Sequence, residues 1–186
     1  MKKNFTQLAF TNSVKKQQEK HGTRNSYSRL ESRLEAFELG NKEIDFILSR
    51  DSFYLSTVGE NGWPYVQHRG GEKGFVNVID NTTLVFPDFS GNGQYISTGN
   101  LHEWSKTMLI MLNYPTRQRL KIWAEASIVE KGFDTELEAR LKIENNPSNV
   151  ERLILLKVQA YDWNCSKHIT PRYTEDEMNR MQQGII

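Results

Sequence analysis

The segment from Asp88 to Asn100, DFSGNGQYISTGN, places three glycines among small hydrogen-bonding residues. Glycine lets a backbone approach a ligand closely, and the free N–H groups at a helix start favour an anion. If Ser90 or Asn92 caps a short helix over residues 94–98 that ends at Gly99, the loop presents such N–H groups to a phosphate. A plain surface loop would have the same composition, so this segment alone does not establish a phosphate site.

A second polar segment is GWPYVQHRGGEKG. Its first residue, Gly62, and the preceding Asn61 favour a hairpin turn. Its return strand carries His68 and Arg69 and ends in paired glycines. An arginine in this setting suits an anion or the edge of a planar ring. A polar strand face in contact with solvent is the alternative interpretation.

A third candidate is the strand RLKIWAE, because alternation places Arg119, Lys121 and Trp123 on one face. A basic and aromatic strand face can hold a flavin-like ring or a phosphate. It can equally be a solvated sheet edge.

A fourth polar and aromatic cluster, DWNCSKHITPRY, contains Cys165 and His168. These two residues supply only two of the ligands that a tetrahedral metal site needs, and no further pair stands at ligand spacing. We therefore predict no metal site. The chain also lacks the P-loop, the GxGxxG turn after a strand, HExxH and GxSxG, which argues against a dinucleotide-binding Rossmann fold.

Composition limits the function classes. The chain has 186 residues, with 24 Lys and Arg against 23 Asp and Glu, and this balance argues against a dedicated nucleic-acid binder. Its single cysteine excludes an intrachain disulfide and fits a reducing cytoplasm. No apolar run approaches the roughly 20 residues of a membrane helix. We expect a cytoplasmic protein that binds neither nucleic acid nor membrane.

The elements that must position these segments change character along the chain. Helical spacing dominates up to SRDS, and strands joined by short turns follow from Phe53. This order predicts a mainly β fold with flanking helices, in which an antiparallel sheet closes into a barrel. We divide the chain into an N-terminal arm (1–25), one barrel domain (26–175) and a C-terminal tail (176–186).

Four segments, taken together, resemble the pyridoxamine 5'-phosphate oxidase-like family of FMN-binding split barrels. They are DSFYLSTVGENGWPYVQHRGG, LVFPDFSGNGQYISTGNL, NYPTRQRLKIWAEASIVE and DWNCSKHITPR. The similarity is to the branch with an HRGG strand and a WNCxxHIxPR tail, and it extends from Ser26 to Tyr173. It implies a six-stranded antiparallel split β-barrel and a homodimer with FMN sites built from both subunits at the interface.

The resemblance also implies roles for particular residues. The loop from Ser90 to Gln94 would cradle the FMN phosphate, and the strand from Gln67 to Gly70 would lie along the flavin ring. Gly93 stands where relatives often carry a basic residue, so other cations or the backbone would hold the phosphate. The implied cofactor-binding set is Gln67, His68, Arg69, Gly70, Ser90, Asn92, Gly93, Gln94 and Arg119, with Trp163 and Arg172 from the other subunit.

Three functions follow from this resemblance. The first is an FMN-dependent oxidoreductase acting on a small molecule, in which the protein holds and tunes the ring. The second is a non-catalytic protein that binds flavin, deazaflavin or haem. For haem the candidate axial ligands are His21, His68, His102 and His168. The third is a dimeric scaffold with a vestigial pocket.

Overall fold

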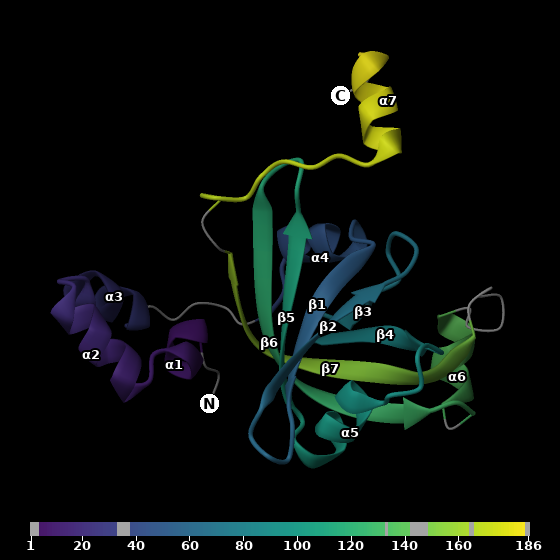
Figure 1. Ribbon diagram of the computed structural model, residues 1–186, viewed down its shortest axis with the longest axis horizontal. Coiled ribbons are helices and arrows are strands. Elements are labelled where there is room, and N and C mark those ends of the chain that lie inside the picture. Colours follow the sequence, from purple (N-terminus) through teal and green to yellow (C-terminus); the bar gives the residue numbers. More distant parts are fainter. Residues whose placement is uncertain (1–3, 33–37, 133, 142–148, 164–165, 185–186) are drawn as a thin grey trace.

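The computed structural model describes residues 4–32, 38–132, 134–141, 149–163 and 166–184 (Figure 1). In this part of the chain a single curved sheet carries helices at its periphery. Its strands pair in the order β2-β1-β5-β6-β7-β4-β3, and every pairing is antiparallel. The strands are β1 (Ser52–Val58), β2 (Pro64–Gly70), β3 (Asn77–Asp80), β4 (Thr83–Phe89), β5 (Lys106–Asn113), β6 (Gln118–Glu130) and β7 (Val150–Trp163).

The prediction of a mainly β, antiparallel fold with flanking helices is confirmed, but the count of six strands is wrong. The short strand β3 pairs with β4 and brings the sheet to seven strands. The sheet is also not closed by hydrogen bonds, because the strand order ends at β2 on one side and β3 on the other. A slit therefore separates the two edges.

The sheet curls around one apolar interior. The rings of Phe53 on β1 and Phe86 on β4 meet edge to face with centroids 5.0 Å apart, although three strands lie between β1 and β4 in the sheet order. The inward positions of β5 and β6 alternate as expected, and Leu109, Met111 and Ile122 are fully buried there. This buried apolar area stabilises the curl.

Helix α4 (Asn41–Leu48) buries Phe46 and Ile47 against the sheet interior. The side chain of Glu43 begins the helix by accepting from the Gly40 N–H at 3.0 Å. Its other oxygen accepts from Trp163 Nε1 at 2.6 Å, and the Trp163 ring packs edge to face on Phe46. The carboxylate therefore ties the start of α4 to the end of β7.

Helix α5 (Ile96–Glu103) connects β4 to β5, and its own residues Ser97 and Leu101 are buried. The expected helix over residues 94–98 ending at Gly99 is wrong in its bounds. Gly99 lies inside the helix because the burial of Leu101 outweighs the weak helix propensity of one glycine.

Three short helices precede the barrel: α1 (Phe5–Ala9), α2 (Asn12–Lys20) and α3 (Arg24–Glu31). The Phe5 ring stacks on Trp123 of β6 with centroids 6.0 Å apart. Glu31 pairs with Lys15 and Arg24, and hydrogen bonds from these two cations hold its pKa below the usual range. The proposed boundary between residues 25 and 26 falls within α3.

Two helices complete the described chain. Helix α6 (Thr135–Arg140) follows β6, and α7 (Glu175–Gln182) projects from the end of the barrel near the C-terminus (Figure 1). Thr174 and Glu177 form a capping box at the start of α7. Among the described helices, none has the length and apolar character that a membrane crossing requires.

Candidate functional site

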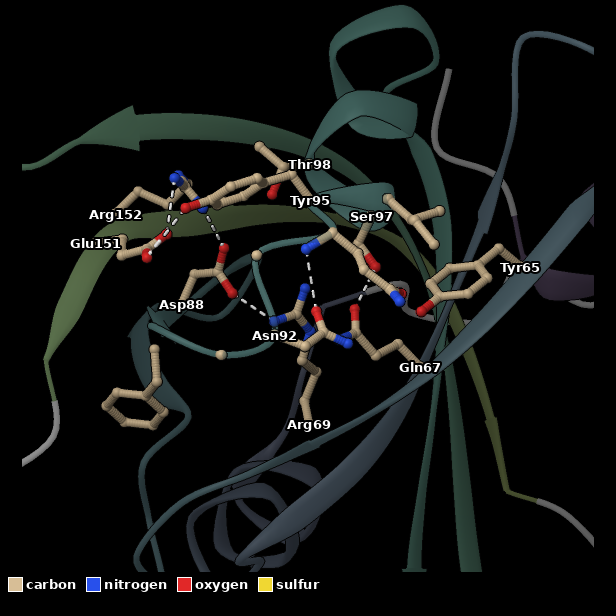
Figure 2. A pocket seen from close by; sticks show the side chains of 15 residues that line it. Tyr65, Gln67, Arg69, Asp88, Asn92, Tyr95, Ser97, Thr98, Glu151 and Arg152 are labelled. Carbon is tan, nitrogen blue, oxygen red and sulfur yellow. Dashed lines mark hydrogen bonds and ion pairs between the residues drawn. The ribbon is translucent and has the colours of Figure 1, made fainter.

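A polar pocket of about 170 Å³ lies where β2, the end of β4, the start of α5 and the start of β7 converge (Figure 2). Strand β2 contributes through its inward positions, since Tyr65, Gln67 and Arg69 alternate with exposed residues. The lining residues are Tyr65, Gln67, Arg69, Asp88, Phe89, Gly91, Asn92, Gly93, Gln94, Tyr95, Ile96, Ser97, Thr98, Glu151 and Arg152.

The carboxylate of Asp88 organises one side of this pocket. It is only 4% exposed, and it accepts from Arg69 Nη1 of β2 through one oxygen and from Arg152 Nη1 of β7, at 2.8 Å, through the other. Arg152 also pairs with Glu151 at 3.0 Å. Burial acts to lower the pKa of Arg152, but the hydrogen bond and charge of Asp88 raise it overall. The Arg152 guanidinium therefore stays charged beside the pocket.

The pair formed by Arg69 and Asp88 crosses the slit of the sheet, because β2 is one edge and β4 lies beside the other edge. A second bond crosses from β2 to α5, where Ser97 Oγ donates to Gln67 Oε1 at 2.7 Å. Arg69 Nε is buried and has no hydrogen-bond partner among the described residues. A buried donor of this kind calls for an acceptor.

The loop between β4 and α5 delivers the start of the helix to the pocket. Gly93 turns the chain with φ +70°, and Asn92 Oδ1 accepts from the Gln94 N–H at 3.1 Å. Tyr95 then adopts the left-handed region at φ 50°, and no side chain caps α5. The uncapped first turn of α5, from Ile96 to Thr98, lines the pocket. An uncapped helix start beside two arginines suits a phosphate or another anion.

The eleven predicted site residues separate into two groups. Five of them line this pocket: Gln67, Arg69, Asn92, Gly93 and Gln94. The other six do not: His68, Gly70, Ser90, Arg119, Trp163 and Arg172.

Residues of the second group have other surroundings within this chain. The His68 ring lies on the outer face of β2, edge to face with Tyr54 at 5.5 Å. The Ser90 N–H donates to the Asn149 carbonyl at 2.8 Å. The Arg172 guanidinium lies 5.1 Å from the centre of the Tyr114 ring. Their roles in a cofactor site stay predictions.

Sequence reasoning missed the charged residues on the strands, namely Asp88, Glu151 and Arg152. A signal was present, since a charged residue inside an apolar strand such as TLVFPDF needs a buried partner. The partner was not readable, because Arg152 lies 64 residues further along the chain. Lys121, another suggested source of positive charge, pairs with Asp162 at 2.7 Å and does not line the pocket.

Comparison with solved structures shows which fold this is. HupZ from Group A Streptococcus is 11% identical at a TM-score of 0.54, covering 73% of this chain and 100% of that one. A candidate pyridoxamine 5'-phosphate oxidase from Lactobacillus delbrueckii is 18% identical at a TM-score of 0.53. The match covers 69% of this chain and 97% of that one. An FMN-binding protein from Syntrophomonas wolfei is 18% identical at a TM-score of 0.53. The match covers 78% of this chain and 96% of that one.

The chain therefore has the fold found in proteins described as pyridoxamine 5'-phosphate oxidases and FMN-binding proteins. No family model matches the sequence, and no curated protein does. Within the described residues, no group of three His, Cys, Asp or Glu side chains is placed to hold a metal ion.

The buried carboxylate gives the first prediction. Asp88→Asn lowers the free energy of unfolding by about 3 kcal/mol, because it leaves two largely buried arginines without their counter-charge. Urea denaturation measures the loss. The matched control is Asp45→Asn at an exposed position of α4, where the loss stays within about 0.5 kcal/mol. Equal losses in the two variants would contradict the role given to Asp88.

The geometry of the loop between β4 and α5 gives the second prediction. Gly93→Ala lowers the free energy of unfolding by about 1–2 kcal/mol, because an alanine is strained at positive φ even though open space surrounds the position. Gly91→Ala in the same loop is the control, since Gly91 has open space and no positive φ. Thermal unfolding compares the two variants, and an unchanged midpoint for Gly93→Ala would refute this account of the turn.

Proposed function

We propose that this protein is a flavoprotein of the FMN-binding split-barrel type, and that the pocket beside Asp88 holds the phosphate of FMN. One observation carries the proposal: Arg69, whose Nε is buried without a hydrogen-bond partner among the described residues, and the uncapped start of α5 line the same pocket. The two features come from separate elements, and each favours an anion. The shared fold with an FMN-binding protein from Syntrophomonas wolfei supports the choice of ligand.

The positive charge for the phosphate would come from Arg69 and Arg152. Glu151 and Asp88 balance these two cations, so the proposal does not depend on a net positive pocket. The left-handed turn at Gly93 favours glycine there, and the loop would contribute backbone N–H groups and the Asn92 amide instead of a lysine or arginine. The Ser97 hydroxyl, already bonded to Gln67, would fix the loop against β2.

Bound FMN would supply the electron-transfer chemistry of a small-molecule oxidoreductase. The protein would hold the phosphate between β2 and α5 and orient the ring along the strand from Gln67 to Gly70. Haem is not favoured, because no histidine is among the described residues that line the pocket.

A homodimer would complete the site. The outer face of the β1–β2 hairpin exposes apolar side chains that a second copy could cover, and Tyr54, Val58 and Val66 are 38%, 39% and 59% exposed there. We place the protein in the cytoplasm on the strength of its single cysteine.

Matched flavins test the phosphate site, since riboflavin has the FMN ring without the phosphate. We expect FMN to bind more tightly than riboflavin in a titration followed by flavin fluorescence. Arg69→Gln weakens FMN by about 10- to 100-fold, because a hydrogen bond to a charged group contributes about 1.5–3 kcal/mol. The affinity for riboflavin does not change.

Arg29→Gln is the control for this titration, because Arg29 is an exposed arginine of α3 that does not line the pocket. Circular dichroism checks that Arg69→Gln is folded, and Arg69→Lys keeps the charge and recovers part of the affinity. Equal affinity of the wild-type protein for FMN and riboflavin would rule out a phosphate site here.

A further inference from the structure

A second pocket, of about 570 Å³, adjoins the first. Tyr65 and Ile96 line both pockets, so the two cavities are neighbours. The second pocket lies between the tip of the β1–β2 hairpin and α5. Its lining residues are Gly59, Glu60, Asn61, Trp63, Pro64, Tyr65, Ile96 and Asn100.

The hairpin holds an aromatic side chain at this pocket. The Trp63 side chain is 74% exposed, although both the N–H and the carbonyl of its backbone form hydrogen bonds. Its N–H donates to Asn61 Oδ1 at 3.1 Å, and its carbonyl accepts from the Gly59 N–H at 2.9 Å. An aromatic ring presented on a fixed turn is ready to stack on a planar ligand, because little conformational freedom is lost on binding.

The chemistry of the second pocket differs from that of the first. The first contains two arginines, whereas no described residue that lines the second is Lys, Arg or His. Instead, Glu60 offers a carboxylate, and Asn61 and Asn100 offer amides. This set suits a planar ring with hydrogen-bond donors and a sugar diol, since carboxylates accept from ribose hydroxyls in nucleotide sites. It does not suit a second phosphate.

Strand β2 orders the two sites along one line. Tyr65 lies at one side of the first pocket and Arg152 at the opposite side, with Gln67 between them (Figure 2). In the proposed function the flavin ring extends from Gln67 toward Gly70. The second pocket begins at Tyr65, so it adjoins the first pocket at the side away from Arg152.

We infer that the second pocket binds the adenosine half of a flavin dinucleotide, with adenine stacked on Trp63 and the ribose diol at Glu60. This inference rests on the proposed function, because it needs the phosphate in the first pocket. It adds that the protein accepts FAD and prefers it to FMN.

Parallel titrations with FAD and FMN test the inference. FAD binds more tightly than FMN to the wild-type protein. Trp63→Ala weakens FAD about tenfold, the size of effect expected for a lost base-stacking contact. It leaves the affinity for FMN unchanged. Glu60→Gln also weakens FAD alone, and this second variant keeps the test valid if the hairpin tip rearranges in Trp63→Ala.

Trp104→Ala is the matched control, since Trp104 is 57% exposed and lines neither pocket. Unchanged FAD affinity in both Trp63→Ala and Glu60→Gln would overturn the inference. If the wild-type protein still binds FMN, the proposed function would stand. Equal weakening of FAD and FMN by Trp63→Ala would also overturn it, because the pocket would then hold the flavin ring. Binding of neither flavin to the wild-type protein would remove both proposals.

Discussion

A single buried carboxylate connects one edge strand of the sheet, β2, to β4, the strand beside the other edge. Asp88 accepts from Arg69 on β2 and from Arg152 on β7, and the first of these bonds spans the slit that backbone hydrogen bonds leave open. An unpaired carboxylate would be unfavourable in this position, so burial of Asp88 and closure of the slit depend on each other. The apolar contact between Phe53 on β1, the neighbour of β2, and Phe86 on β4 brings the same two sides of the sheet together from the interior.

This constraint also shapes the candidate site. Asp88 orients two guanidinium groups toward the pocket, and the loop that follows it turns at Gly93 and Tyr95 to place the start of α5 opposite them. The residues that bridge the slit are therefore residues that line the candidate site. We expect ligand binding and stability to be coupled for this reason, since an anion that contacts Arg69 adds a further bridge across the slit.

Local patterns in the sequence indicated most of the strands and a glycine-rich loop between β4 and β5. Alternation identified β6, and the glycine-rich segment did prove to lead into a helix start. The sequence could not reveal the partners of Asp88, because those contacts depend on the order of strands in the sheet. Nor could it reveal the end of α5, which burial of Leu101 determines more than Gly99 does. Placement of Trp163 and Arg172 in a shared site needs a second subunit.

The most direct measurement is the visible absorption spectrum of freshly purified protein, with the released cofactor identified by mass spectrometry. The account predicts flavin absorption bands and release of a phosphate-bearing flavin. A colourless protein that also fails to take up added FMN or FAD would contradict it. The bonds of Asp88 would then serve only to join β4 to β2 and β7.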